Sequence, residues 1–342
     1  MSTAAAGRPL RLGILGAARV VEYALLRPAR SDSSVEVVAI AARNPDRART
    51  FASRHGIPQA YPSYEALLAA PDIEAIYNPL PNSLHCEWSI RALDAGKHVL
   101  CEKPIASNTA EAERMAAAAR RTGRVLAEAF HWRYHPLAER LRDIIRSGEI
   151  GKLRHVEGHM CVPIFDGRDI RYQLSLAGGA TMDCGCYVIS MLRFLTGAEP
   201  EVLSARAWLR FPGVDRKMVA ELRFPEGATG RLVCSLLSPV VLRITARAVG
   251  DLGTLSVFNP IGPHALRRFT RKGLHLVKVR TRSGTRFERV EGPTTYACQL
   301  RAFAAAVREG KLLPTTAEDG VLNMRVIDAI YRKAGLSPRG LN

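Results

Sequence analysis

Two short motifs hold the residue types that could move a proton while a hydride is transferred. Glu-Lys-Pro at 102–104 ends an apolar run, and Asp-Cys-Gly-Cys-Tyr at 183–187 lies inside a second apolar stretch. A lysine near a tyrosine favours the phenolate by Coulomb attraction, so the tyrosine can exchange a proton with a carbonyl oxygen. Lys103 and Tyr187 are therefore predicted to be catalytic. Without a nucleotide-binding fold around them, either motif alone would more often be structural.

Asp183 is the third candidate for catalysis. A helix predicted over 178–195 places Asp183 and Tyr187 on one face, at positions i and i+4. From there Asp183 would orient either the substrate or Lys103.

The loop before this helix supplies candidates for substrate binding. Arg168 and Arg171 suit an anionic group such as a diphosphate, and the positive balance of the chain would attract such a substrate. The alternative is that both arginines are solvated or pair with Asp166 and Asp169. The predicted substrate-binding residues are Arg171, Tyr172, Asp183 and Tyr187.

The elements that must position these motifs begin with residues 10–130, in which strand and helix patterns alternate. Such alternation predicts a parallel sheet with right-handed crossovers. In the first strand–helix turn, Gly16 fits the first glycine of a dinucleotide fingerprint, while Ala18 and Val21 replace the second and third. The residues of this turn predicted to bind the cofactor are Gly16, Ala17, Ala18, Arg19 and Val20.

The end of the second predicted strand bears on the choice of cofactor. NAD sites usually place Asp or Glu there, whereas an arginine accommodates a 2′-phosphate. This chain has Arg43 at that position, Arg47 one turn later and no carboxylate before Asp46. NADP(H) is therefore the preferred cofactor and NAD(H) the alternative, with Arg43 as the contact to the phosphate. Otherwise Arg43 would be a solvated strand end.

Composition and charge restrict the classes of function. The chain has 342 residues, 49 Lys and Arg against 32 Asp and Glu, and a formal net charge of +17. The densest basic cluster, 267–282, lacks interleaved aromatic residues, so nucleic-acid binding is not favoured. No apolar stretch is long enough to span a membrane. Seven scattered cysteines without ligand spacing indicate no metal site and a reduced, cytoplasmic compartment.

After residue 136 the pattern changes. A helix to residue 147, a strand over 154–162 and the helix over 178–195 precede predicted strands at 201–211, 216–224, 228–236, 241–249, 252–258 and 264–290. Helices over 294–309 and 317–334 end the chain. This meander predicts an antiparallel sheet with one face open to solvent or to another subunit, and hence a homodimer or homotetramer.

The predicted fold class is therefore α/β with two domains. A flexible tail at 1–9 precedes a doubly wound Rossmann domain at 10–135. An α+β domain with a large, mostly antiparallel open sheet follows at 136–342. Whether the C-terminal helices pack back on the first domain is left open.

Four longer motifs make the chain similar to one family. They are Asn-Pro-Leu-Pro-Asn-Ser-Leu-His at 78–85, Ala-Gly-Lys-His-Val-Leu-Cys-Glu-Lys-Pro at 95–104, Glu-Ala-Phe-His-Trp-Arg-Tyr-His-Pro at 128–136 and Gly-Gly-Ala-Thr-Met-Asp-x-Gly-x-Tyr at 178–187. Over nearly its full length the chain resembles the Gfo/Idh/MocA family of oxidoreductases. The resemblance implies a Rossmann domain followed by an open-sheet domain, with the nicotinamide near Lys103. Ala177 departs from a glycine that is frequent in the family.

The resemblance also implies further cofactor contacts. They are Pro79, Leu80, Asn82, His85, Glu102, Lys103, Trp132 and Arg133. His85 could instead be a buried core histidine. Trp132 and Arg133 could equally be structural, with Arg133 paired to a carboxylate. Glu102 would position the turn or a cofactor ribose.

The tyrosine at 187 resembles a particular branch of the family. Members that act on inositol have His there, whereas glucose–fructose oxidoreductases, dihydrodiol dehydrogenases and ketoreductases of nucleotide-linked deoxysugars have Tyr. The resemblance, together with Arg43 and the charge of the chain, predicts NADP(H)-dependent, metal-independent oxidation or reduction of a sugar-like substrate. The arginines of the 166–172 loop place a nucleotide-linked keto-sugar ahead of a neutral sugar. The alternatives are a dihydrodiol or xylose dehydrogenase, and a non-catalytic NADP-binding sensor or regulatory protein.

Overall fold

The computed structural model describes residues 8–262 and 275–341, which form two compact units. The first unit contains Met1–Ala106, Ala110–Tyr134 and Tyr296–Val321, and the second contains Ser107–Thr109, His135–Thr295 and Leu322–Asn342. The helix α9 (Thr295–Glu309) thus belongs mainly to the first unit, the arrangement that the prediction left open for the C-terminal helices. Most of the predicted tail, the start of the strand predicted at 264–290 and part of the basic cluster lie outside the described residues.

The first unit is built on a six-stranded sheet in the order β3-β2-β1-β4-β5-β6. Every pairing between neighbouring strands is parallel. This is the strand order of a doubly wound nucleotide-binding fold, as predicted. The strands are β1 (Leu10–Leu15), β2 (Val35–Ala41), β3 (Gln59–Tyr61), β4 (Ala75–Asn78), β5 (His98–Cys101) and β6 (Leu126–Glu128).

Helices of the first unit follow the strands and bury them. They are α1 (Arg27–Ala29), α2 (Pro45–His55), α3 (Tyr64–Ala69), α4 (Asn82–Asp94), α5 (Thr109–Thr122) and α9, with a 3₁₀ turn at His131–Tyr134. Leu12 of β1, Leu25 and Phe303 of α9 share one apolar core. The sequence predicted one regular helix after β1. The structure instead has a π-helical turn, Glu22–Leu26, ahead of the short α1.

The second unit is built on an eight-stranded sheet in the order β14-β13-β12-β11-β7-β10-β9-β8. All its pairings are antiparallel except that of β7 with β10. The predicted large, mostly antiparallel sheet is therefore confirmed. Its strands are β7 (Leu153–Cys161), β8 (Glu201–Phe211), β9 (Val214–Arg223), β10 (Thr229–Ser235), β11 (Arg243–Gly250), β12 (Gly253–Phe258), β13 (Leu276–Thr281) and β14 (Gly284–Glu288).

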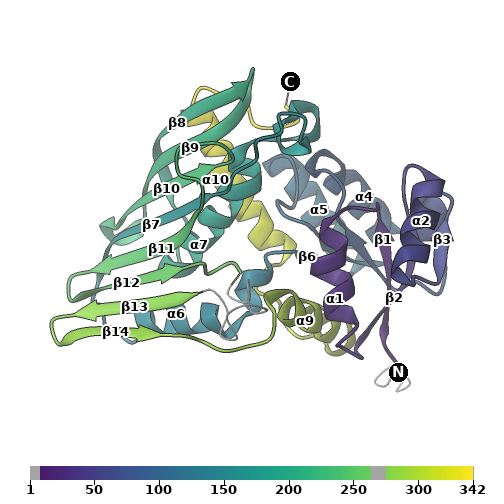
Figure 1. Ribbon diagram of the computed structural model, residues 1–342, viewed down its shortest axis with the longest axis horizontal. Coiled ribbons are helices and arrows are strands. Elements are labelled where there is room, and N and C mark those ends of the chain that lie inside the picture. Colours follow the sequence, from purple (N-terminus) through teal and green to yellow (C-terminus); the bar gives the residue numbers. More distant parts are fainter. Residues whose placement is uncertain (1–7, 263–274, 342) are drawn as a thin grey trace. The chain divides into compact units, whose positions relative to one another are not determined.

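Helices cover one face of this sheet, where α6 (Pro136–Arg146) and α7 (Cys186–Thr196) lie against the strands (Figure 1). The buried helix α7 packs on β7 at Gly158, because a Cβ there would lie only 2.6 Å from Val188. The chain then closes with α10 (Ala317–Lys333), whose Asn323 donates a hydrogen bond to the carbonyl of Cys186. The glycine at position 158 of β7 thus allows α7 to pack close to the sheet.

The start of the predicted 178–195 helix differs from the prediction. Residues Thr181–Gly185 form a π-helical turn, closed by a bond from the N–H of Cys186 to the carbonyl of Thr181, and α7 begins only afterwards. A π-turn holds more residues than an α-turn. The predicted regular helix is therefore irregular at its start, with Asp183 in the wider turn and Tyr187 in the first turn of α7, and their common face stays a prediction.

Candidate functional site

The turn after β1 has the geometry of a dinucleotide site. Gly16 has φ +89°, and a Cβ there would lie 3.0 Å from the side chain of Leu80, so glycine is required. Its N–H donates to the carbonyl of Ala41 at 2.7 Å, which joins the turn to the end of β2. Val21, at the third glycine position, is fully buried in the apolar core. That departure from the fingerprint therefore has a packing role.

Two arginines lie at the end of β2, beside this turn. Arg43 is exposed two residues after the strand, and Arg47 of α2 donates from Nη2 to the carbonyl of Ala17 at 3.1 Å. Asn44 between them caps α2 by accepting from two backbone N–H groups. Tyr64 contacts the same region, and its pKa is raised, chiefly by burial. A phosphate group bound here would have guanidinium donors nearby, and no carboxylate at the end of β2 would repel it.

The loop after β4 is held by buried polar contacts. The amide of Asn78 donates to the hydroxyl of Ser89 at 3.0 Å and accepts from the N–H of Leu80 at 3.3 Å. These bonds fix the path of the loop that leads through Pro79 into α4, where Asn82 is the first residue. Pro79, Leu80 and Asn82 thus follow the carboxyl end of a parallel strand, where ligands of such sheets bind.

His85 has the contacts of a core residue. The ring is fully buried, with Nδ1 2.8 Å from the carbonyl of Pro104 and Nε2 2.7 Å from that of Leu80. Only the imidazolium could donate to both carbonyls, yet burial outweighs these contacts and lowers the pKa of His85 to about 4. His85 therefore joins two loops as a core residue, the alternative considered for it, and a contact with the cofactor stays a prediction.

The turn that carries Lys103 is positioned by its neighbour. The carboxylate of Glu102 accepts from the hydroxyl of Tyr77 at 2.6 Å and from the N–H of Lys103 at 3.3 Å. Burial, together with the charge of Glu102, raises the pKa of Tyr77 well above its ordinary value, so this hydroxyl stays a donor. Of the two roles expected for Glu102, positioning the turn agrees with these contacts, while a bond to a ribose stays a prediction.

Trp132 and Arg133 have structural contacts. The Trp132 side chain is only 1% exposed. Arg133 lies 3.4 Å from the carboxylate of Asp319 and donates to the carbonyl of Pro314 at 3.2 Å. The carboxylate partner considered for Arg133 is thus present in the first unit. A cofactor contact of either side chain stays a prediction.

In the second unit, Arg171 joins two carboxylates. Its Nε lies 3.1 Å from Asp183 and its Nη1 lies 3.1 Å from Asp169. Asp183 is the main reason that the pKa of Arg171 is raised. Arg168, for its part, pairs with Asp166. The structure thus shows the pairing alternative for both arginines, and it adds a contact between Arg171 and Asp183 that the sequence did not indicate.

Tyr172 and Tyr187 are largely buried in the second unit. The hydroxyl of Tyr172 donates to the carbonyl of Ile164 at 2.9 Å, and its side chain is buried. Tyr187 lies in the first turn of α7 and is 5% exposed. Lys103 lies in the first unit, so the pairing of Lys103 with Tyr187 stays a prediction.

A buried group of polar side chains holds the π-turn before Tyr187. The carboxylate of Asp215 accepts from the N–H and hydroxyl of Thr181, both at 2.7 Å, and pairs with Arg339 at 2.8 Å. Tyr331 donates to the same carboxylate at 3.0 Å. Arg339 also donates to the carbonyl of Gly178 at 2.7 Å. We call Thr181, Asp215, Tyr331 and Arg339 the Asp215 clamp.

Both halves of the chain match models of one protein family. Residues 10–130 match the model described as oxidoreductase family, NAD-binding Rossmann fold, and residues 138–256 match that of the GFO/IDH/MocA C-terminal domain. The chain belongs to the Gfo/Idh/MocA family of oxidoreductases.

Similar members of the Gfo/Idh/MocA family carry sugar-related names. D-xylose 1-dehydrogenase (NADP(+)) 2 of Haloferax volcanii is 36% identical over 95% of this chain and 97% of its own. dTDP-3,4-didehydro-2,6-dideoxy-alpha-D-glucose 3-reductase of Actinomadura kijaniata is 32% identical over 96% and 97%. A crystal structure of the 3-ketoreductase KijD10 from Actinomadura kijaniata, with NADP and TDP-benzene, aligns with a TM-score of 0.87 at 31% identity, over 95% and 98%.

Some site residues of this Gfo/Idh/MocA member were missed at the level of sequence. Asp215 and Arg339 lie far along the chain from the motif that they hold, and no local pattern connects them. Tyr64 gave no signal either, whereas Arg47 was visible one helical turn after Arg43. Within the described residues, no group of His, Cys, Asp and Glu is arranged to hold a metal ion, and no helix is long and apolar enough to cross a membrane.

Proposed function

We propose that this oxidoreductase uses NADP(H) to interconvert a hydroxyl and a carbonyl group on a sugar-like substrate. The turn at Gly16, which admits no side chain and lies beside Arg43 and Arg47, is the observation that supports the proposal most. The backbone can approach a pyrophosphate there, and two guanidinium groups can bind a 2′-phosphate. The names of the similar xylose dehydrogenase and ketoreductase, which mention NADP, support the same cofactor.

In the proposed chemistry, bound NADPH supplies a hydride from nicotinamide C4. Tyr187 donates a proton to the carbonyl oxygen of the substrate, and Lys103 binds that oxygen and stabilises the phenolate that forms. In the oxidative direction Tyr187 takes the proton back. Asp183, held by Arg171, orients the substrate. KijD10 has also been solved with a tyrosine changed to phenylalanine and with a lysine changed to alanine, the residue types proposed here.

Two substrate classes remain, and different observations favour each. A nucleotide-linked keto-sugar is favoured by the positive charge of the chain and by the name of the dTDP-sugar reductase relative. A free sugar, as in a xylose-type dehydrogenase, is favoured by the contacts of Arg168 and Arg171, which already pair with carboxylates. The nucleotide-linked substrate needs Arg171 to exchange one of these partners for a phosphate.

Turnover assays separate the classes. NADPH consumption with dTDP-linked and free keto-sugars, and NADP⁺ reduction with free sugars, are compared for the native chain and for Arg171→Gln. We expect turnover in one of these panels and its loss in Tyr187→Phe. NADPH binding without turnover on any panel would contradict the proposed enzyme and favour a sensor or regulatory protein. An equal kcat/KM for both keto-sugar classes, unchanged in Arg171→Gln, would exclude recognition of an anionic group.

We also propose that the open face of the eight-stranded sheet joins copies of this chain. No helix among the described residues of the second unit covers this face (Figure 1). It presents aromatic side chains among cationic ones: Trp208 is flanked by Arg206 and Lys217, and Phe287 is 60% exposed. Exposed aromatic residues with basic neighbours are typical of protein interfaces.

A further inference from the structure

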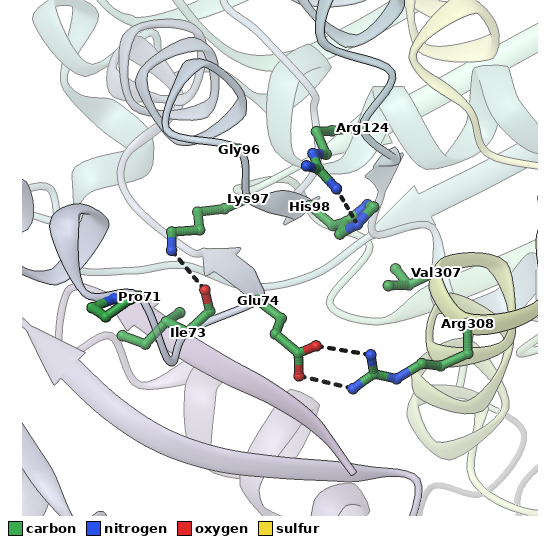
Figure 2. Close-up of a pocket in the computed structure, with 9 residues that line it drawn as sticks. All are labelled: Pro71, Ile73, Glu74, Gly96, Lys97, His98, Arg124, Val307 and Arg308. Atoms are coloured by element: carbon green, nitrogen blue, oxygen red, sulfur yellow. Dashed lines mark hydrogen bonds and ion pairs between the residues drawn. The ribbon is translucent and has the colours of Figure 1, made fainter. Parts of the chain in front are cut away.

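A pocket of about 300 Å³ lies at the amino ends of β4, β5 and β6 in the first unit (Figure 2). Glu74 directly precedes β4, Lys97 and His98 lie at the start of β5, and Arg124 precedes β6. The proposed cofactor residues follow the carboxyl ends of parallel strands, so this pocket lies at the other edge of the same sheet. The lining residues are Pro71, Ile73, Glu74, Gly96, Lys97, His98, Arg124, Val307 and Arg308.

The hydrogen-bond acceptors around this pocket already accept from side chains of the protein. The carboxylate of Glu74 accepts from both terminal nitrogens of Arg308 at 2.8 Å, and Arg8 lies 3.0 Å from the same group. Lys97 donates to the carbonyls of Ala70 and Ile73, both at 2.7 Å. An ammonium has three N–H donors, so one donor of Lys97 is left over.

His98 presents a further donor to the pocket. Its Nδ1 accepts from the N–H of Val125 at 3.0 Å, which requires an unprotonated nitrogen there. A neutral imidazole carries its proton on one nitrogen, so Nε2 must be the N–H. Nη1 of Arg124 lies 3.5 Å from this Nε2, and a guanidinium has only donors (Figure 2). The N–H of His98 Nε2 and the guanidinium of Arg124 are therefore two donors that face each other, and an acceptor between them would satisfy both.

Among the described residues, Arg124 has no carboxylate partner. The buried Nε of Arg308 has no hydrogen-bond partner among the described residues. Burial and the nearby Arg124 charge lower the pKa of His98 to about 4, and both also lower the pKa of Lys97. Lys97, Arg124 and Arg308 thus place three cationic groups around a space whose lining holds one carboxylate, that of Glu74, while Asp72 offsets part of the charge of Lys97 from outside the lining. An anion between them would reduce their mutual repulsion.

We propose that this pocket binds a small oxyanion, either inorganic phosphate or the phosphate group of a small monoester. The Nε2–H of His98 and the guanidinium of Arg124 would donate to its oxygens. A pocket of about 300 Å³ is at the lower limit for small-molecule sites, which suits a phosphate monoester and excludes a dinucleotide. This site is independent of the proposed function, because it shares no residue with the cofactor or catalytic positions.

Calorimetric titration tests the site. Inorganic phosphate and glucose 6-phosphate are titrated in separate arms, with sodium chloride of equal ionic strength as the blank. The native chain and Arg43→Gln, a matched change at the opposite edge of the sheet, should show saturable binding. Arg124→Gln should weaken that binding by about tenfold, since it removes charge-assisted hydrogen bonds. Binding of one titrant alone would identify the free ion or the monoester as the ligand.

The same titration can overturn the proposal. Binding that is lost in Arg43→Gln and unchanged in Arg124→Gln would assign the anion to the cofactor turn, and heats equal to those of the chloride blank would exclude the site. Val307→Glu is a second variant, since it places a carboxylate in the pocket on α9. It should abolish phosphate binding, because the new carboxylate repels the anion. Native-like phosphate binding by Val307→Glu would contradict the proposal.

Discussion

At the level of single residues, the site depends on side chains whose neighbours hold them in place. Tyr77 holds Glu102 beside Lys103, and Arg171 holds Asp183. Sequence motifs predict Lys103, Asp183 and Tyr187 as site residues because each occurs within a short recognisable pattern. Their partners come from elsewhere in the chain and carry no motif. The sequence left two roles open for His85 for the same reason, since the two carbonyls that enclose its ring become neighbours only in the fold.

The first prediction concerns the proposed acid–base pair. Tyr187→Phe and Lys103→Ala should each lower kcat by roughly 10²–10⁴, the usual effect of losing a positioned proton-transfer group. The dissociation constant of NADPH should change much less, because neither residue is proposed to hold the pyrophosphate. Steady-state kinetics and NADPH titration of each variant give both values. Near-native turnover of Tyr187→Phe would show that the proton comes from another group.

At the level of elements, the sequence predicted most helices and strands but not the irregular turns. Strand β8 and helix α9 follow clear periodic patterns and lie within a residue of their predicted bounds. Strand β3 has three residues and is too short for a periodic signal. The π-turn at Thr181–Gly185 also has no local signature, because the Asp215 clamp that holds it comes from distant parts of the chain.

The second prediction tests the clamp as a positioning device for Tyr187. Thr181→Val removes one hydrogen bond to Asp215 while keeping the shape of the side chain. We expect kcat to fall several-fold and the NADPH dissociation constant to stay unchanged, because the bond holds only the turn before α7. Thr196→Val, at the far end of the same helix, is the matched control. Equal kcat in both variants would refute the positioning role.

Asp215→Asn is the stronger change in the same clamp. It leaves Arg339 buried without its counter-charge, since the side chain of Arg339 is 2% exposed and that of Asp215 is 0% exposed. Breaking a buried pair on one side typically costs about 3–5 kcal/mol. We therefore predict that urea denaturation will show a loss of this size in the free energy of unfolding. A loss below about 1 kcal/mol would mean that water or another group compensates Arg339.

For the molecule as a whole, fully buried His85 and half-buried His98 contribute to the response to acid. The pKa values of His85 and His98 are both lowered from 6.5 to about 4, chiefly by burial. Between these values the unfolded chain binds protons that the folded chain does not, so the free energy of unfolding falls as the pH is lowered from 6.5 towards 4. Fully buried His85 contributes up to roughly 3 kcal/mol over this range.

Denaturation curves between pH 6.5 and 4.5 measure this loss. His85→Asn should flatten the pH dependence, although it lowers stability at neutral pH. A free energy of unfolding that stays constant over this range in the native chain would show that neither histidine resists protonation.

The state of association is also a property of the whole molecule. Sedimentation at micromolar concentration should show a dimer or tetramer. Trp208→Glu, on the open face of the sheet, should shift it to the monomer without changing NADPH affinity. A native chain that sediments as a monomer would remove the proposed interface.

Titration with NADPH and with NADH tests the proposed cofactor use directly. The native chain should bind NADPH at least about tenfold more tightly than NADH, because charge-assisted bonds from Arg43 and Arg47 need the 2′-phosphate. Arg43→Ala should reduce this preference while leaving NADH affinity nearly unchanged. Tighter binding of NADH by the native chain, or no saturable binding of either nucleotide, would contradict the proposal that this protein is an NADP(H)-dependent oxidoreductase.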